Sequence, residues 1–228
     1  MNYKNNINIK CELGDYWCEM LDKEIISKTE KDLNELIHKN TLNIFLPKEQ
    51  KDIFKIFKIC TPNDIKVVVL GQDPYYADIN QANGIAFAVH EHLKIPPSLK
   101  NIFKELKNNY PDATIDKTLE SWVKSGVFLL NTSLTVTKGK PGSHMNIWKS
   151  FTDHVIQKLS KDYDSIIFVL LGNFAEKKRD LICTNNNKNR ILSYSHPSPL
   201  SCYKTDKPFI GSNLFKNING LLNNKIKF

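Results

Sequence analysis

The chain has 228 residues, of which 41% are hydrophobic and 25% are charged, a balance typical of a globular protein. No apolar run approaches the roughly 20 residues that span a bilayer, and the start MNYKNNINIK lacks the apolar core of a secretory signal. We therefore expect neither a membrane protein nor a secreted one. The expected location is the cytoplasm, or the nucleus in a eukaryotic host.

The net charge of +8 makes nucleic acid the first partner to consider. Compositional drift is the alternative, because lysine, asparagine and isoleucine are abundant together and only Arg179 and Arg190 are arginines. The five cysteines are scattered and include no CxxC pair. Free thiols in a reducing compartment are therefore expected, rather than disulfides or an iron–sulfur cluster.

Residues 1–64 show mainly helical patterns. Thr29 can cap a helix whose inward residues recur at helical spacing, namely Leu33, Leu36 and Ile37. A second helix is expected to begin at Pro47 and to end near the turn signal TPND at 61–64. Its inward residues are Ile53, Phe54, Ile56 and Phe57.

From residue 65 onward, apolar β-branched segments alternate with helical ones. The predicted strands are 65–70, 127–131, 165–171 and 190–195, and the predicted helices are 98–109, 118–125, 148–160 and 174–182. Continuous apolar runs separated by helices predict an α/β fold with a parallel sheet that is covered on both faces. Right-handed crossovers then place all four strand ends at one edge of the sheet.

Polar, turn-forming residues follow every predicted strand: GQDPYY at 71–76, Asn131 with TSLTV after it, GNFAEKK at 172–178 and HPSPLSCYK at 196–204. Ligands of open α/β sheets bind outside the carboxyl ends of the strands, so this edge is the expected site. The sequence lacks GxGxxG, GxxxxGK[ST] and HExxH, and its nearest approach to GxSxG is GKPGSH at 139–144. Dinucleotide, nucleoside triphosphate and zinc sites therefore have little support.

Three side chains at different strand ends offer chemistry. Asp73 can position or deprotonate a water, and His196 can donate a hydrogen bond to developing negative charge. The amide of Asn131 can read the edge of a planar heterocycle, on which Phe87 can stack. Each also has a structural interpretation: Asp73 as a turn cap, His196 as a structural histidine, Asn131 as a loop anchor and Phe87 as a core residue.

These segments together resemble the family 1 uracil-DNA glycosylases. The matching stretches are GQDPYY with NQANGIAFAV, PPSLKNIFKEL, GVFLLNTSLTV with GSH after it, LLGNFAEKK and HPSPLS, in family order from about residue 60 to 218. The resemblance implies one three-layer α/β/α domain over residues 1–228 with a central four-stranded parallel sheet. Residues 1–60, which match only loosely, form its mainly helical part, and 61–228 form the catalytic α/β core.

The resemblance also implies an activity. Such an enzyme flips deoxyuridine out of DNA and hydrolyses its N-glycosidic bond in base excision repair, releasing uracil and leaving an abasic site. It needs no metal and no cofactor. The implied partners are single- and double-stranded DNA that contains uracil, with the enzyme as a monomer that is sensitive to a protein inhibitor mimicking DNA.

Roles for individual residues follow from the same resemblance. Asp73 matches the catalytic acidic residue that orients or activates water and stabilises the positive sugar, and His196 matches the imidazole that faces uracil O2. The uracil-binding residues are implied to be Gln72, through its backbone; Tyr75, which crowds uracil C5; Phe87, which stacks; and Asn131, which reads the base. The implied DNA contacts are Pro97, Ser98, Gly172, Asn173, Ser198, Leu200 and Tyr203, with Leu200 as an apolar wedge.

The sequence departs from the family pattern in several places. Tyr76 stands where histidine is more common, Asn173 stands where serine is common, and the segment 203–212 is about three residues longer than usual. Tyr76 and His144 are secondary candidates, and for His144 a phosphate-facing or structural role is expected rather than a catalytic one.

Two other functions stay open at this point. One is a binding module that retains the fold with weak or no activity, and the other is a glycosylase for a different lesion. The combination of Asp73, Asn131 and His196 argues against a pure binder, and Tyr75 together with Asn131 favours uracil.

Overall fold

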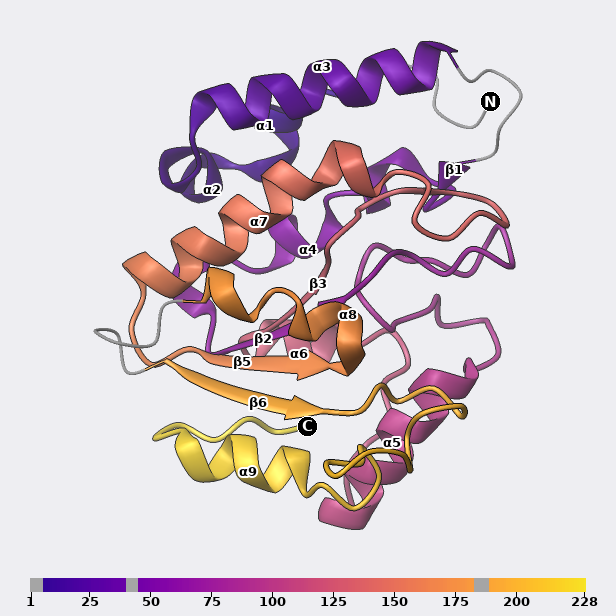
Figure 1. Ribbon diagram of the computed structural model, residues 1–228, viewed down its shortest axis with the longest axis vertical. Coiled ribbons are helices and arrows are strands. Elements are labelled where there is room, and N and C mark those ends of the chain that lie inside the picture. Colours follow the sequence, from indigo (N-terminus) through magenta and orange to yellow (C-terminus); the bar gives the residue numbers. More distant parts are fainter. Residues whose placement is uncertain (1–5, 40–44, 183–188) are drawn as a thin grey trace.

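A four-stranded parallel sheet forms the centre of the computed structural model, which describes residues 6–39, 45–182 and 189–228 (Figure 1). The strands pair in the order β3-β2-β5-β6. They are β2 Val67–Gly71, β3 Val127–Asn131, β5 Ile167–Leu171 and β6 Arg190–Tyr194. The predicted four-stranded parallel sheet is confirmed, with β2 and β5 each beginning two residues later than expected.

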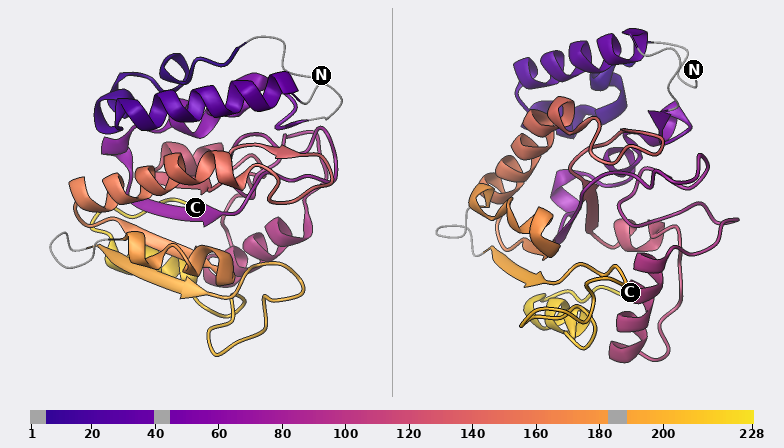
Figure 2. Two further views of the ribbon diagram at one scale, coloured as in Figure 1. Left: turned by 45° about the horizontal axis from the view of Figure 1, so that its top comes forward. Right: turned by 45° about the vertical axis from the view of Figure 1, so that its right-hand side comes forward.

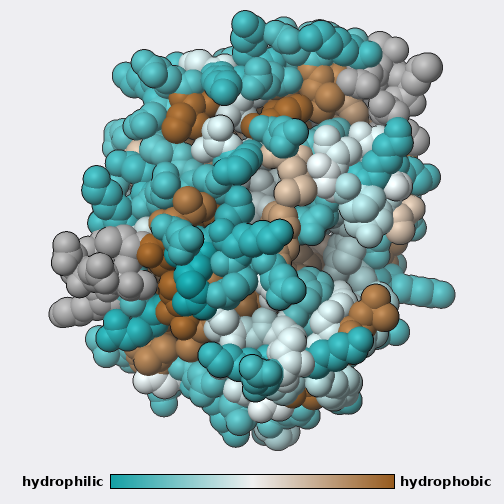
Figure 3. Space-filling view, in the orientation of Figure 1, coloured by the Kyte–Doolittle hydropathy of each residue, from teal (hydrophilic) through white to brown (hydrophobic). Residues whose placement is uncertain are grey.

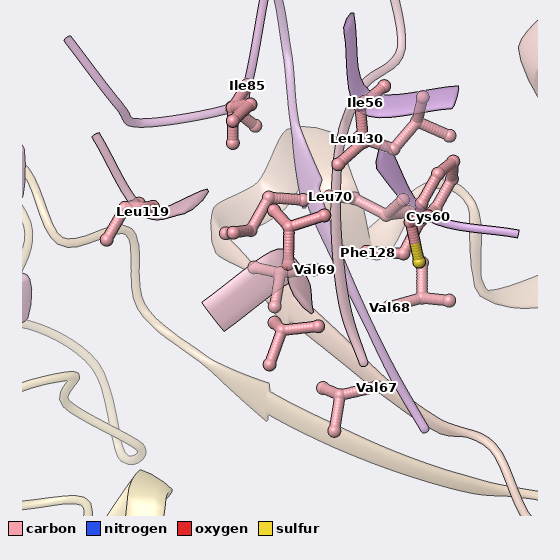
Figure 4. Packing of buried hydrophobic residues seen from close by; sticks show 14 of the residues in the cluster. Ile56, Cys60, Val67, Val68, Val69, Leu70, Ile85, Leu119, Phe128 and Leu130 are labelled. Carbon is pink, nitrogen blue, oxygen red and sulfur yellow. The ribbon is translucent and has the colours of Figure 1, made fainter. Parts of the chain in front are cut away.

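Every residue of β2, β3 and β5 is buried, because helices cover both faces of the sheet. Successive side chains of a strand point to opposite faces. Val68 accordingly points to the side of Cys60 and Phe128, whereas Val69 points to the side of Leu119 (Figure 4). The continuous apolar runs in the sequence reflect this two-sided burial.

Aromatic residues mark the two helical layers. On one face, Phe128 of β3 stacks on Trp17 with ring centroids 5.1 Å apart and meets Phe57 at 5.5 Å. On the other face, Trp122 meets Phe215 at 5.5 Å. The first layer contains α2 Asp15–Met20, α4 Lys55–Ile59 and α7 Met145–Asp162, with α1 Ile9–Leu13 and α3 Lys23–Lys39 packed against it; the second contains α5 Pro97–Asn109, α6 Glu120–Lys124 and α9 Leu214–Leu221 (Figures 1 and 2).

Short elements complete the chain. The 3₁₀ turns are η1 Gln50–Asp52, η2 Pro62–Asp64 and η3 Arg179–Leu181, and the helix after β5 is α8 Gly172–Glu176. Two small strands, β1 Phe45–Leu46 and β4 Val136–Thr137, pair in antiparallel fashion. This pairing joins the N-terminal part of the chain to the segment that follows β3.

Two helix predictions in the N-terminal part were wrong in detail. Thr29 is not a cap but a buried residue inside α3, because the apolar stripe of that helix already includes Ile26. No helix begins at Pro47; the chain forms η1 and then α4, separated by Ile53 and Phe54. Both of these side chains are buried, so helical periodicity alone does not reveal the break.

Helix limits differ elsewhere as well. The predicted helix 174–182 is the shorter α8 followed by η3, and α7 is longer at both ends than its prediction. Within the described part of the chain, no helix has the length and apolar character of a membrane span.

Candidate active site

A cavity of about 470 Å³ lies at the carboxyl edge of the parallel sheet. Its lining includes most of the site residues that the sequence predicts: Gln72, Asp73, Tyr75, Tyr76, Phe87, Pro97, Ser98, Asn131, His196 and Ser198. The segments that carry them follow β2, β3 and β6 or begin α5. The strand ends therefore bring together side chains that are more than a hundred residues apart in sequence.

The loop after β2 is fastened to the chain that follows β3. The carbonyl oxygen of Gln72 accepts hydrogen bonds from the backbone N–H of Ser133 at 2.9 Å and from the hydroxyl of Thr132 at 3.1 Å. Thr132 N–H also donates to the carbonyl oxygen of Gly71 at 3.0 Å. These bonds hold the GQDPYY loop against the edge of the sheet.

Asp73 is half-buried at the cavity wall. Its Oδ2 accepts a hydrogen bond from the backbone N–H of Gly142 at 2.5 Å and a long one from Gln72 Nε2 at 3.5 Å. Burial raises the pKa of Asp73, and these two hydrogen bonds act in the opposite direction because they favour the charged form. Gly142 thus orients the carboxylate, a contact that sequence reasoning missed because a backbone N–H leaves no side-chain signal.

Tyr75 and Phe87 form an aromatic part of the wall. The Tyr75 hydroxyl donates to the carbonyl oxygen of Phe87 at 3.1 Å, and burial raises the pKa of the phenol. Phe87 has a φ of 67°, a left-handed conformation that is uncommon outside glycine. Its ring centroid lies 5.9 Å from that of His196. Backbone strain of this kind is concentrated at functional sites.

Asn131 is the last residue of β3 and lies beside Gly71 in the sheet register. A Cβ atom at Gly71 would stand 2.3 Å from Asn131 Oδ1, so glycine is needed there to leave room for the amide. Asn131 is buried, and within the described ranges its side chain makes no hydrogen bond to the protein. Its donor and acceptor groups are therefore free for a ligand in the cavity.

His196 follows β6 and approaches Gly172, where α8 begins. Nδ1 of His196 accepts a hydrogen bond from the backbone N–H of Ser198 at 3.1 Å. Burial lowers the pKa of His196, so the ring is neutral near pH 7. With Nδ1 as an acceptor, the single ring proton is on Nε2. The ring is thus a neutral hydrogen-bond donor through Nε2.

A sequence model of the Uracil DNA glycosylase superfamily matches residues 57–222. The chain belongs to this superfamily. It is 44% identical over 209 residues to the uracil-DNA glycosylase of Buchnera aphidicola subsp. Acyrthosiphon pisum (strain Tuc7), a match that covers 90% of this chain and 92% of the relative. It is also 44% identical over 213 residues to the uracil-DNA glycosylase of Borreliella burgdorferi (strain ZS7), covering 91% and 92%.

Solved structures agree with this assignment. The crystal structure of mimivirus uracil-DNA glycosylase matches with a TM-score of 0.86 at 29% identity, covering 97% of this chain and 89% of that one. A mimivirus variant solved in complex with UGI matches with a TM-score of 0.85 and covers 98% and 91%. The predicted family and the three-layer α/β/α fold are confirmed.

Among the predicted DNA contacts of this uracil-DNA glycosylase superfamily member, Pro97, Ser98 and Ser198 line the cavity, whereas Gly172, Asn173, Leu200 and Tyr203 lie outside the described lining. Pro97 and Ser98 form the first turn of α5, which begins one residue before the predicted start at Ser98, because a proline at the start of a helix gives up no hydrogen bond. Gly172 and Asn173 begin α8. Leu200 and Tyr203 project from the loop between β6 and α9, with 78% and 61% of their surfaces exposed.

The two secondary candidates differ in position. Tyr76 is 39% exposed at the cavity. His144 is buried, and its two ring nitrogens lie 2.8 Å and 2.9 Å from the hydroxyls of Thr135 and Thr137. Burial lowers its pKa to about 4. His144 therefore faces the interior, with both ring nitrogens beside hydroxyl groups of the protein.

A group of three or more histidine, cysteine or acidic side chains that could hold a metal ion is not found in the part of the chain that the structure describes.

Proposed function

We propose that this chain excises uracil from DNA in base excision repair. It flips deoxyuridine out of the strand, hydrolyses the N-glycosidic bond, and leaves free uracil and an abasic site. The observation that carries the proposal is one cavity that combines Asp73, Asn131 and His196 with the rings of Tyr75 and Phe87. Membership of the uracil-DNA glycosylase superfamily supports the same activity.

Breaking the bond between base and sugar separates charge. The sugar gains cationic character and the uracil gains negative charge. The Asp73 carboxylate, held by Gly142 N–H, orients the attacking water and stabilises the cation. Neutral His196 donates its Nε2–H to uracil O2 as negative charge develops there. Asp73 thus acts on the positive charge of the sugar, and His196 acts on the negative charge of the base.

Base selection rests on shape and on hydrogen bonding. Asn131 accepts from uracil N3–H and donates to O4, groups that are reversed in cytosine. An edge read in this way can reject the wrong base by roughly 10⁴–10⁵-fold. Tyr75 occupies the space beside uracil C5, where thymine carries a methyl group, and Phe87 stacks on the base. The Gln72 backbone adds a further contact to uracil.

Access to deoxyuridine in a duplex requires that the nucleotide leave the stack, at a free-energy cost of a few kcal/mol. An inserted Leu200 fills the gap that remains. Phosphates are held around the cavity, with contacts assigned to Pro97, Ser98, Gly172, Asn173, Ser198 and Tyr203. Tyr76, in place of the more common histidine, lines the cavity and contributes a phenol to the sugar or phosphate side.

The proposed substrates are single- and double-stranded DNA, and the proposed working form is a cytoplasmic monomer, or a nuclear one in a eukaryotic host. Support for a monomer comes from the mainly hydrophilic face in Figure 3, where hydrophobic residues gather only in small groups. Sensitivity to a DNA-mimicking protein inhibitor is supported by the mimivirus complex with UGI. Metal and cofactor are not required by any step proposed.

Uracil release from defined oligonucleotides tests the proposal. Single strands and duplexes with one deoxyuridine are incubated with the protein in the presence of EDTA, and matched thymidine oligonucleotides serve as controls. We expect free uracil and alkali-labile abasic sites from both deoxyuridine substrates only. DNA binding without uracil release at every salt concentration would contradict the proposal and support the binding-module alternative.

A further inference from the structure

The loop between β6 and α9 carries Leu200 and projects beside α5 (Figures 1 and 2). Its turn is closed by its own backbone, since the N–H groups of Ser201 and Cys202 both donate to the carbonyl oxygen of Ser198 at 2.9 Å. Leu200 itself is 78% exposed, so its side chain has little packing to fix it. The position of this side chain therefore depends on how the two legs of the loop are held.

Asn101 of α5 holds the base of the turn on both sides of Leu200. Its Nδ2 donates to the carbonyl oxygen of Pro197 at 2.9 Å and also lies 3.4 Å from the Sγ of Cys202. The amide of Asn101 thus links Pro197, three residues before Leu200, to Cys202, two residues after it. Cys202 is buried against the same region, which adds apolar packing to the hydrogen bonds.

Two further residues of α5 hold the longer, returning leg. Lys104 Nζ donates to the Tyr203 hydroxyl at 2.8 Å and lies 5.5 Å from the centroid of that ring. The buried carboxylate of Glu105 accepts from the backbone N–H groups of Gly211 at 2.7 Å and Asn213 at 2.8 Å. These contacts fix both ends of the segment that is longer than usual for the family.

The three residues lie on one face of the helix, because positions 101, 104 and 105 have the i, i+3 and i+4 spacing of helical neighbours. The same helix begins at Pro97 and places Ser98 at the cavity. We propose that this loop-holding face of α5 (Asn101, Lys104 and Glu105) positions Leu200 for insertion into the duplex, so that α5 links the cavity to the wedge. The inference rests on the proposed uracil excision.

Preorganisation gives the physical reason. A wedge that is already placed loses little conformational freedom when it enters the stack, whereas a free loop must be ordered at that moment. Only a duplex has a base stack to be opened and filled. The loop-holding face therefore matters for duplex substrates and not for single strands, where the deoxyuridine is already accessible. Its members are positioning residues, not catalytic ones.

Single-turnover uracil release from a duplex and from the same sequence as a single strand tests the inference in Asn101→Ala and Lys104→Met. Since small displacements of a working group can reduce a rate by up to about 10²-fold, we expect the duplex-to-single-strand rate ratio to fall roughly tenfold in Asn101→Ala. A smaller fall is expected in Lys104→Met. Lys107→Met is the matched control, because Lys107 is exposed on the same helix but donates to the carbonyl oxygen of Pro111.

A double-mutant cycle with Leu200→Ala shows whether Asn101 acts through the wedge. We expect Asn101→Ala to have no further effect on the duplex rate once Leu200 is truncated. The inference would be overturned by an unchanged duplex-to-single-strand rate ratio, which is what equal rate losses on both substrates give. Additive rate losses in the double-mutant cycle would overturn it too. If the thermal unfolding of Asn101→Ala differs from that of the wild-type protein, the test rests on Lys104→Met instead. The duplex-to-single-strand rate ratio of Lys104→Met is then compared with that of Lys107→Met. A wild-type protein that releases no uracil from single strands would contradict the proposed function itself and the inference with it.

Discussion

Tyr75 is held at the cavity wall by its own hydroxyl, which donates to the Phe87 carbonyl oxygen at 3.1 Å. Removing the ring opens space beside the base. We predict that Tyr75→Ala releases thymine from undamaged DNA, as measured by abasic sites in thymidine oligonucleotides. Tyr75→Phe retains the ring and is expected to reject thymine. An active Tyr75→Ala variant that still rejects thymine would remove Tyr75 from base selection.

Asn131 offers a donor and an acceptor that the described part of the chain leaves unused. In Asn131→Asp the amide donor is replaced by an acceptor, which suits the exocyclic amino group of cytosine and repels uracil O4. We predict that release of uracil slows by roughly 10²-fold or more and that release of cytosine becomes detectable. Competition between deoxyuridine and deoxycytidine oligonucleotides measures the change. Unaltered preference for uracil would contradict the assigned role.

The sequence identifies the polar side chains of the cavity well, and the reason is topological. Asp73 and His196 each follow a strand, Asn131 ends one, and parallel strands end at one edge. Backbone contributions are invisible in the sequence. The Gly142 N–H that binds Asp73 could not be predicted, nor could the two threonine partners that make His144 an interior residue.

At the scale of elements, the tight junction between β5 and α8 supports His196. Gly172 has a φ of 83°, and a Cβ atom there would lie 2.8 Å from His196 Cβ. We predict that Gly172→Ala displaces the imidazole and lowers the rate of uracil release more than it lowers DNA affinity. Gly14→Ala is the matched control, because Gly14 has a φ of 76° but no atom within 4 Å of its added Cβ. Equal activity of the two variants would contradict this view of the junction.

Strands were easier to predict than helices in this chain. Two-sided burial gives β2, β3 and β5 continuous apolar runs that no exposed helix shares. The helix α9 has the sequence LFKNINGL, in which two asparagines and a glycine are weak helix formers. It exists because Leu214, Phe215 and Ile218 are buried against the sheet layer. Such tertiary stabilisation cannot be read from local propensity.

At the scale of the whole molecule, the N-terminal part is joined to the site through β1, β4 and His144. The folded pKa of His144 is about 4, and its ordinary value is 6.5. Between these values the unfolded chain binds more protons than the folded one, so lowering the pH favours unfolding. We predict that this residue reduces the free energy of unfolding by about 3 kcal/mol as the pH falls from 6.5 to 4.

Urea unfolding at a series of pH values measures this effect. We expect the dependence over that range to be weaker in His144→Gln, which cannot take up a proton. The pH dependence of the free energy of unfolding is also measured in His196→Gln for comparison, because burial lowers the pKa of His196 too. An identical dependence in the wild-type protein and His144→Gln would show that His144 does not control acid stability.

Asp73 drives uracil release in the proposed reaction, and Asp73→Asn tests this role most directly. Asparagine has the same shape but lacks the charge that stabilises the sugar cation and orients water. We predict that the single-turnover rate on a deoxyuridine duplex falls by roughly 10²–10⁴-fold, while the affinity for the same DNA stays close to that of the wild-type protein. A variant that releases uracil at nearly the wild-type rate would contradict the account.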